Sequence, residues 1–475
     1  MKTIGRKREI EQLDRLCSSE KSEFIAVYGR RRVGKTYLIR AYFQQEFAFH
    51  LTGLANANTQ QQLTNFHSTL VRQRSPEFAG QVPENWLEAF QKLIDHIEAI
   101  STKGKKVVFL DELPWLDTPR SDFIMALEHF WNSWASNRTD IVLVTCGSAA
   151  SWMLNQLINN RGGLHNRVTA RIKMHPFTLK ETEELLKDRG NVLDRYQIIQ
   201  LYMVMGGIPF YLDAVSPGMS AAQNIEALCF RRGALLVTEF KNLFASLFKK
   251  PEKYEKVIIA LSSKRKGMTR NELSKKSGLS TGGGLTRILQ ELEESGFISS
   301  YSPFDKKIRN TIYRLSDFYS LFYIKFIQDN RNFEEGVWLN AIDAPAHRAW
   351  SGYTFEQVCM THIPQIKKAL GISGVQSESS SWTSTSSEKG AQIDLLIDRR
   401  DQVVNICEIK YSIGPFQINK SYADILRNKL SFFKQETATR KSVHLTMITT
   451  YGLKENEYAR SMVQNEISMD ALFEG

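Results

Sequence analysis

A glycine loop with the spacing G-x-x-x-x-G-K-S/T occupies residues 29–36, between an apolar run at 24–28 and a helical pattern at 37–43. This spacing is typical of the P-loop, whose backbone N–H groups surround nucleotide phosphates. Lys35 is expected to reach the β- and γ-phosphates, and Thr36 to hold Mg²⁺. A chance match in a basic loop is the alternative. The predicted nucleotide-binding residues are Gly29, Arg30, Arg31, Arg32, Val33, Gly34, Lys35, Thr36 and Tyr37.

Two adjacent acids, Asp111 and Glu112, follow the apolar run 107–110. Such a run is typical of a strand buried on both faces of a parallel sheet. We expect Asp111 to support the coordination of Mg²⁺ and Glu112 to orient and polarise the attacking water. This ending is common by itself, but its position behind a P-loop predicts an ATP-hydrolysing site.

Three further positions are candidates for the same site. Ser148 follows the apolar run 141–144 and is either a γ-phosphate sensor or an ordinary turn serine. Arg167 is either a catalytic cation for the transferring phosphoryl group or a surface cation. The pair Gly5-Arg6 opens a helix that either lines the nucleotide or belongs to the surface.

A second set of chemical residues lies in the last third of the chain. The segments 391–398 and 402–410 predict a β-hairpin, with Asp394 on its first strand and Glu408 and Lys410 on its second. Residues two apart on a strand share a face. Two carboxylates can hold Mg²⁺ or Mn²⁺ while a lysine polarises water, and the helix-borne Glu356 would complete the metal site. A solvent-facing strand with ordinary charges is the alternative.

The chain is long enough for several domains that position these residues. It has 475 residues, of which 42% are hydrophobic, and a net charge of +11 that suggests a nucleic-acid partner without proving one. Its five cysteines are scattered, as expected for reduced thiols in a cytoplasmic protein. The N-terminus has no apolar signal core, and no apolar run approaches the ~20 residues of a membrane span.

We predict four domains: an ATPase core at 1–175, a helical lid at 176–248, a winged-helix domain at 249–330 and a nuclease-like domain at 331–475. The winged helix is indicated by a capping box at Thr269 and Glu272, a helix at 285–296 and a hairpin tip at 305–310. It would either contact DNA or pack internally.

The Ser/Thr-rich segment 377–387 is expected to be a loop. The basic residues predicted near phosphates are Arg270, Lys275, Lys276, Arg287, Lys306, Lys307 and Arg309.

The chain resembles the archaeal-type ATPase family, in the STAND branch of the AAA+-like P-loop proteins. The matching motifs are Gly5-Arg6, the loop 29–36, and the segments 110–112, 146–148, 164–167, 175–177 and 206–209. The resemblance implies that Pro209 contacts the base or sugar of the nucleotide. It also implies a C-terminal domain related to the PD-(D/E)xK nucleases. Asn166 departs from the glycine that is common before the arginine.

The predicted fold class is therefore α/β: a parallel-sheet P-loop ATPase with a helical lid, a winged helix and a restriction-endonuclease-like C-terminal domain. Three functions fit these patterns. The first is an ATP-dependent, metal-dependent nuclease that acts on DNA. The second is a STAND-type switch that binds DNA or protein without cleavage, and the third is an ATPase that senses peptide or protein. A homo-oligomer is implied if Arg167 acts across a subunit boundary.

Overall fold

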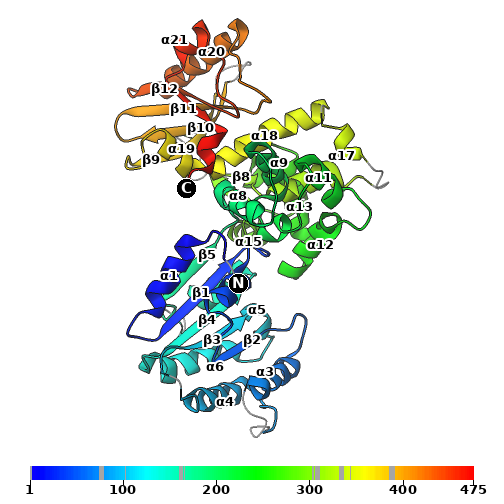
Figure 1. Cartoon of the computed structure of the whole chain (residues 1–475), viewed down its shortest axis with the longest axis vertical. Helices are drawn as coiled ribbons and strands as arrows, with labels where there is room; N and C mark the ends of the chain where they lie inside the picture. The colour runs from blue at the N-terminus through cyan, green and yellow to red at the C-terminus, as the bar shows by residue number, and fades with distance from the viewer. Residues whose placement is uncertain are drawn as a thin grey trace. The chain divides into compact units, whose positions relative to one another are not determined.

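The structure is a computed structural model, and Figure 1 follows its elements along the chain. It describes residues 3–73, 80–101, 103–159, 164, 166–301, 304, 311–330, 336–342, 344–384 and 391–475. The chain divides into two units, Met1–Pro176 and Phe177–Gly475. No helix among these described residues is long and apolar enough to cross a membrane.

The first unit is built on a five-stranded parallel sheet in the order β2-β3-β4-β1-β5. Every residue of β1 and β4 is buried, as expected for strands covered on both faces. The predicted parallel α/β core is therefore confirmed. The strands are β1 (Glu23–Gly29), β2 (Phe49–Thr52), β3 (Lys106–Asp111), β4 (Ile141–Gly147) and β5 (Ala170–Met174).

Helices follow most strands of the first unit and bury their apolar faces on the sheet. The α-helix α6 (Phe123–His129) continues into a π-helix at Phe130–Trp134. Trp131 packs against Phe24 with ring centroids 5.0 Å apart, so it belongs to the core. The helices are α1 (Lys7–Cys17), α2 (Lys35–Tyr42), α3 (Thr59–Gln73), α4 (Trp86–Glu98), α5 (Leu113–Leu116), α6 (Phe123–His129) and α7 (Ala150–Trp152).

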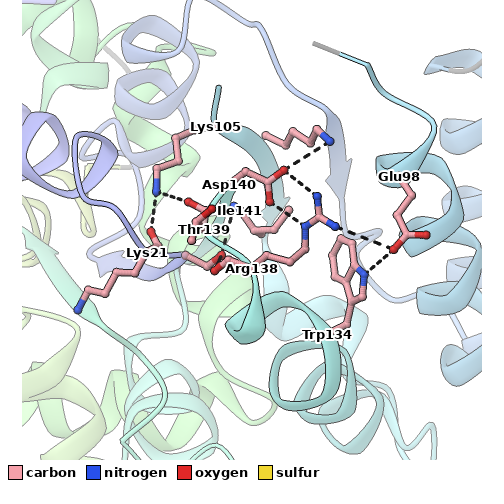
Figure 2. Close-up of polar contacts among 10 residues, drawn as sticks. Lys21, Glu98, Lys105, Trp134, Arg138, Thr139, Asp140 and Ile141 are labelled. Atoms are coloured by element: carbon pink, nitrogen blue, oxygen red, sulfur yellow. Dashed lines mark hydrogen bonds and ion pairs between the residues drawn. The ribbon is translucent and has the colours of Figure 1, made fainter. Parts of the chain in front are cut away.

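A polar network ties together the segments that lead into the strands of this sheet, at their amino ends (Figure 2). Arg138 donates two hydrogen bonds to the Asp140 carboxylate, at 2.7 and 2.8 Å. Lys105 donates to the carbonyls of Lys21 (2.6 Å) and Thr139 (2.8 Å). These contacts join the chain before β1, β3 and β4, far along each strand from the ends that carry the predicted site.

The second unit begins with helices. Thr178 caps the first of them in a reciprocal capping box with Glu181. The turn at Gly206 and Gly207 has φ of 65° and 69°. A side chain at Gly207 would meet the Phe177 carbonyl oxygen at 2.2 Å, so this position requires glycine. The helices are α8 (Leu179–Asp188), α9 (Arg195–Met205), α10 (Pro209–Leu212), α11 (Ala221–Cys229) and α12 (Leu235–Leu247).

The middle of this unit pairs three helices with a small sheet of order β6-β8-β7. The predicted capping box at Thr269 and Glu272 is present. Lys306, Lys307 and Arg309 of the predicted hairpin tip lie outside the described residues. The elements are α13 (Pro251–Ser262), β6 (Met268–Thr269), α14 (Arg270–Ser277), α15 (Gly283–Glu294), β7 (Ile298–Tyr301) and β8 (Ile312–Leu315).

The aromatic segment after β8 forms α16 (Phe318–Phe322) and a π-helix at Tyr323–Ile327, and its rings are largely buried. Residue 331, the predicted start of the C-terminal domain, lies outside the described residues. Three helices follow: α17 (Val337–Asn340), α18 (Pro345–Thr361) and α19 (Ile363–Ala369).

The C-terminal sheet has the order β13-β12-β11-β10-β9. Its centre is the predicted antiparallel hairpin, β10 (Gln392–Arg399) with β11 (Val403–Lys410). The loop prediction at 377–387 is wrong for its first part, because Ser377–Thr383 forms β9 and pairs with β10 along one edge of the sheet. Residues 385–387 lie outside the described part. The remaining elements are α20 (Lys420–Thr437), β12 (Ser442–Thr449), α21 (Glu457–Met462) and β13 (Asn465–Ser468).

Candidate functional sites

The P-loop joins the carboxyl end of β1 to the first residue of α2, where open α/β sheets bind ligands. Gly29 has φ of 142°, and a side chain there would approach the Met174 carbonyl oxygen to 2.3 Å. Gly34 has φ of 89° and forms the N-cap of α2. Both glycines are therefore required by the path of the loop, as their positions in the motif predict.

Arg6 supports this loop from the start of α1. Its guanidinium donates to the carbonyls of Val33 (2.8 Å) and His175 (2.7 Å). The side chain is buried, so the surface alternative is wrong for Arg6 itself. The arginine joins the P-loop to the segment after β5, a positioning role that the sequence did not predict. Its contact with nucleotide stays a prediction.

Lys35 is buried at the amino end of α2 and bends back into the loop. Its Nζ donates to the carbonyls of Gly29 (3.1 Å) and Arg30 (3.0 Å). Burial lowers the pKa of Lys35, while the charges of Glu112 and Asp111 oppose that shift. The ammonium group therefore lies within the cradle that the motif predicts for phosphates.

The two acids after β3 accept hydrogen bonds from the two predicted hydroxyl residues. Thr36 Oγ1 lies 3.0 and 2.9 Å from the carboxylate oxygens of Asp111. Ser148 donates to Glu112 from its hydroxyl (2.8 Å) and its backbone N–H (3.3 Å). Burial and the neighbouring Glu112 charge raise the pKa of Asp111. The hydroxyl and carboxylate oxygens of Thr36 and Asp111 are donors of the type that Mg²⁺ binds.

Two further predicted nucleotide contacts belong to other elements of the chain. Arg167 is exposed in a turn before β5. Asn166 has φ of 58°, a left-handed conformation that asparagine tolerates better than most residues and that explains the departure from glycine. Pro209 begins α10 in the second unit. The nucleotide contacts of Arg167 and Pro209 stay predictions.

The second candidate site lies on the C-terminal sheet. The register of the hairpin ends at the pair Leu395–Cys407, and Asp394 and Glu408 flank this pair on their two strands. Glu408 and Lys410 are two apart on β11 and share a face. Lys410 Nζ is 3.1 Å from Glu408 Oε1. The charges of Asp394, Glu408 and Lys410 all act on Glu356, so the structure brings the predicted residues near one another.

Two residues of α20 complete the surroundings of Glu408. Lys429 donates to Glu408 Oε2 at 2.7 Å, and the Tyr422 hydroxyl donates to Glu408 Oε1. Burial alone would raise the pKa of Glu408, but the two lysines outweigh it and lower the pKa. The sequence assigned no role to Lys429 or Tyr422, because their spacing is that of any amphipathic helix.

Glu356 joins this site from α18. Burial and the charge of Asp394 raise the pKa of Glu356 to about 8, so its carboxyl group holds a proton at neutral pH. Glu356, Asp394 and Lys429 line a cavity of about 910 Å³. The raised pKa measures how unfavourable a further negative charge is at this position.

The carboxylate oxygens at this second site are donor atoms of the type that hard divalent cations bind. Carboxylate oxygens are the ligands that Mg²⁺ and Mn²⁺ prefer, and Mg²⁺ needs only one or two of them beside water. A cation would also relieve the repulsion that raises the pKa of Glu356. Within the described part of the chain, no three acid, histidine or cysteine side chains are grouped closely enough to hold a metal ion together.

Comparison with known proteins agrees with the architecture of the first site. Residues 4–215 match the family described as "ATPase domain predominantly from Archaea". An uncharacterized protein of Methanocaldococcus jannaschii is 24% identical over 433 residues, which cover 89% of this chain and 91% of the relative. An uncharacterized ATP-binding protein of the same organism is 44% identical over 43 residues, 9% of this chain and 73% of that protein.

Solved structures similar to this chain include the Walker-type ATPase of Pyrococcus abyssi, with a TM-score of 0.49 and 15% identity over 68% of this chain and 96% of that one. The ORC2 protein of Aeropyrum pernix gives a TM-score of 0.41 and 16% identity over 69% and 93% of the two chains. The family match, together with the P-loop and the parallel sheet, shows that the chain carries an archaeal-type P-loop ATPase domain.

Proposed function

We propose that the chain couples its ATPase to a second, metal-dependent site that cleaves phosphodiesters in DNA. The observation that supports this proposal is the convergence of Asp394, Glu408 and Lys410 near Glu356, which lines the same cavity as Asp394. In this proposal, residues 249–330 form a winged helix and the C-terminal sheet is of the PD-(D/E)xK type.

At the first site, the P-loop and Lys35 hold the phosphates of ATP, and Thr36 and Asp111 hold Mg²⁺. Glu112 orients the attacking water, while Ser148 holds Glu112 in place and senses the γ-phosphate. Arg167 and Pro209 are the proposed phosphoryl and base or sugar contacts.

At the second site, one or two of the carboxylates of Asp394, Glu408 and Glu356, together with water, would hold Mg²⁺ or Mn²⁺, which supplies Lewis-acid activation of water and phosphate when bound. Lys410 lies beside Glu408 and can polarise or position the water. Glu356 must give up its proton to bind a cation with full charge, so its occupancy by metal depends on pH.

A nuclease assay with the full chain and Mn²⁺ tests this second site. We expect cleavage of DNA by the wild type, and its loss in Asp394→Ala and Lys410→Ala. Arg460→Gln is the matched control, because Arg460 is an exposed cation of the same unit that pairs with Glu455. Equal survival of DNA and RNA with the wild type and both variants, across metals and salt concentrations, would refute the nuclease proposal.

The coupling itself is tested by adding ATP. Lys35→Ala should remove any effect of ATP on cleavage while leaving ATP-independent cleavage in place. Identical cleavage with and without ATP in the wild type would show two independent activities.

A STAND-type switch that binds DNA or a protein partner without cleavage is the second candidate. The occupation of Glu408 by Lys410, Lys429 and Tyr422 favours it, because these contacts balance the carboxylate without a metal. This candidate predicts salt-dependent DNA binding, nucleotide-dependent association, or both, and no product in the nuclease assay.

A further inference from the structure

The cavity beside Glu356 has walls from two parts of the second unit. One wall belongs to the C-terminal sheet and its helices, and includes Asp394 and Lys429. The other comes from the turn between α13 and β6 and from the hairpin β7–β8, and includes Arg265 and Arg314. Glu356 and Asp394 of the proposed nuclease site therefore share one cavity with cations from the middle of the chain.

The two arginines gather on one aromatic ring. The guanidinium of Arg314 lies 4.9 Å from the centre of the Tyr353 ring, and that of Arg265 lies 5.4 Å from it. Arg314 also donates to the Tyr353 hydroxyl at 3.2 Å. Tyr353 is three residues before Glu356 on α18, so both side chains lie on neighbouring positions of one helix face.

Among the described residues, these two cations lack the close ion pairs that other cations of the unit form, although the charge of Glu356 acts on Arg314. Lys264, on the same wall, pairs with Glu272 at 2.5 Å. Arg314 is half-buried and Arg265 is exposed. A guanidinium beside an aromatic ring and without a carboxylate in direct contact is suited to bind an anion, and phosphate fits its planar, forked donors.

Aromatic side chains border the cavity beside these cations. Tyr301, Phe304 and Phe432 line it, and Phe304 packs against the C-terminal core, with its ring centroid 5.6 Å from that of Phe433. Cations that follow a phosphate backbone, with aromatic rings on which bases stack, are the combination that binds single strands without base pairing. The volume of about 910 Å³ is in the range of small-ligand sites, so it can admit unpaired nucleotides but cannot enclose a duplex.

We infer that this cavity binds a single strand of nucleic acid, with Arg314 and Arg265 as its phosphate-binding residues. The inference rests on the proposed nuclease function in naming its substrate class, yet it concerns binding alone. Arg314 and Arg265 hold the backbone beside Tyr353, one helical turn from Glu356, and Asp394 lines the same cavity. A duplex must open or present a free end to reach them.

Fluorescence anisotropy with the full chain in EDTA tests the inference without cleavage. The probes are a labelled 12-nucleotide oligo-dT and a blunt hairpin duplex of equal length. We expect the single strand to bind at least about 10-fold more tightly than the duplex. Arg314→Gln should weaken this binding about 10-fold and lower the slope of log K against log salt by about 0.7, the value for one phosphate contact in a single strand.

Arg265→Gln is the second variant, because Arg265 is exposed and its loss leaves the core intact. It should weaken binding of the single strand about threefold to tenfold. Arg460→Gln, which removes an exposed charge outside the cavity, should leave binding unchanged. The inference is overturned if the duplex binds as tightly as the single strand, if neither probe binds, or if folded Arg314→Gln and Arg265→Gln proteins bind like the wild type.

These outcomes are separate from those of the nuclease assay. Arg314-dependent binding of the single strand without any cleavage would refute the nuclease proposal and leave the inference standing. Cleavage that is lost in Asp394→Ala but unaffected by Arg314→Gln and Arg265→Gln would support the nuclease proposal and overturn the inference.

Discussion

The two sites of this chain treat their charged groups in opposite ways. In the first, Asp111 and Glu112 accept hydrogen bonds from the hydroxyls of Thr36 and Ser148, and Lys35 donates to backbone carbonyls. In the second, Glu408 is bound directly by Lys410 and Lys429. The first site keeps its acids and its lysine on separate partners, whereas the second pairs them with each other.

Because of this difference, the first site can bind an anion without breaking an ion pair, whereas the second must break ion pairs before it can bind a cation. Carbonyl oxygens are neutral, so phosphates can replace them around Lys35 without breaking an ion pair. A cation at Glu408 must compete with two lysines, and at Glu356 it must also displace a proton. Binding of a ligand should therefore change the second site more than the first.

Replacement of Lys35 tests the first half of the comparison and has the largest expected effect. Lys35→Ala removes the buried ammonium that lies in the P-loop, so ATP hydrolysis should fall by at least ~100-fold. Glu112→Gln should slow the chemical step by about 100-fold while ATP still binds, because only water activation is lost. Steady-state phosphate release and equilibrium ATP binding separate the two effects.

Lys410→Ala is the matched control, since it removes a lysine from the second site. Its ATP hydrolysis without DNA should equal that of the wild type. Wild-type turnover in Lys35→Ala would contradict the assignment of the P-loop as the hydrolytic site.

Acidification is expected to destabilise both units, because each contains a histidine whose pKa is lowered by burial: the partly buried His50 in the first and the buried His362 in the second. Burial lowers the pKa of His362 and of His50 to about 4. In His362, Nδ1 lies 2.8 Å from the Val358 carbonyl and Nε2 accepts from the Leu179 N–H, which fits the neutral form. The unfolded chain binds a proton at about pH 6.5 and the folded chain near pH 4, so stability is lost as pH falls through this window.

The loss amounts to roughly 3 kcal/mol for a fully buried histidine such as His362. Denaturant unfolding between pH 7 and pH 4 measures it. His362→Asn should be less stable at pH 7 but lose less stability on acidification, whereas His129→Asn, at an exposed position, should follow the wild type. Parallel pH profiles for His362→Asn and the wild type would contradict this origin of acid sensitivity.

Lys429→Met tests the second half of the comparison. It leaves the buried Glu408 with Lys410 and Tyr422 as partners, so the free energy of unfolding should fall by about 2 kcal/mol. Lys434→Met changes an exposed lysine of the same helix and should have little effect. An unchanged denaturant midpoint in Lys429→Met would show that Lys410 alone compensates Glu408.

The first site was predictable because its residues are close in sequence to the elements that position them. The glycine spacing at 29–36 and the acids at the end of a buried strand reflect backbone geometry, which local patterns record. The sequence did not predict that Arg6 supports the P-loop, because the partners of Arg6 are the backbone carbonyls of Val33 and His175. Every residue has a backbone carbonyl, so the sequence does not show which carbonyls accept a hydrogen bond.

The second site was predictable only in its hairpin. Asp394, Glu408 and Lys410 are joined by strand pairing, and alternation along a strand fixes which of them share a face. Lys429, Arg314 and Tyr353 reach the same cavity from other helices and strands. Their convergence depends on packing between elements, which spacing does not record. The same limit explains the error at Ser377–Thr383, where pairing with β10 makes a strand of a Ser-rich segment.

The network at the amino ends of the first sheet should affect stability alone (Figure 2). Asp140 accepts two hydrogen bonds from Arg138, and these lower the pKa of its carboxyl group. Both side chains are about a third exposed, so the pair is screened, and Asp140→Asn should lower the free energy of unfolding by only about 1 kcal/mol. Parallel sheets bind ligands at the carboxyl ends of their strands, so ATP hydrolysis should not change.

Measurement of both quantities in one variant makes this the most selective of the tests. Asp140→Asn keeps the shape of the side chain and removes only its charge, so the backbone path into β4 is preserved. Lower stability with wild-type ATP turnover would show that the two ends of the sheet are energetically separate. Reduced turnover at unchanged stability would contradict that separation, because it would require the amino-end network to act on the P-loop through the length of β1 and β4.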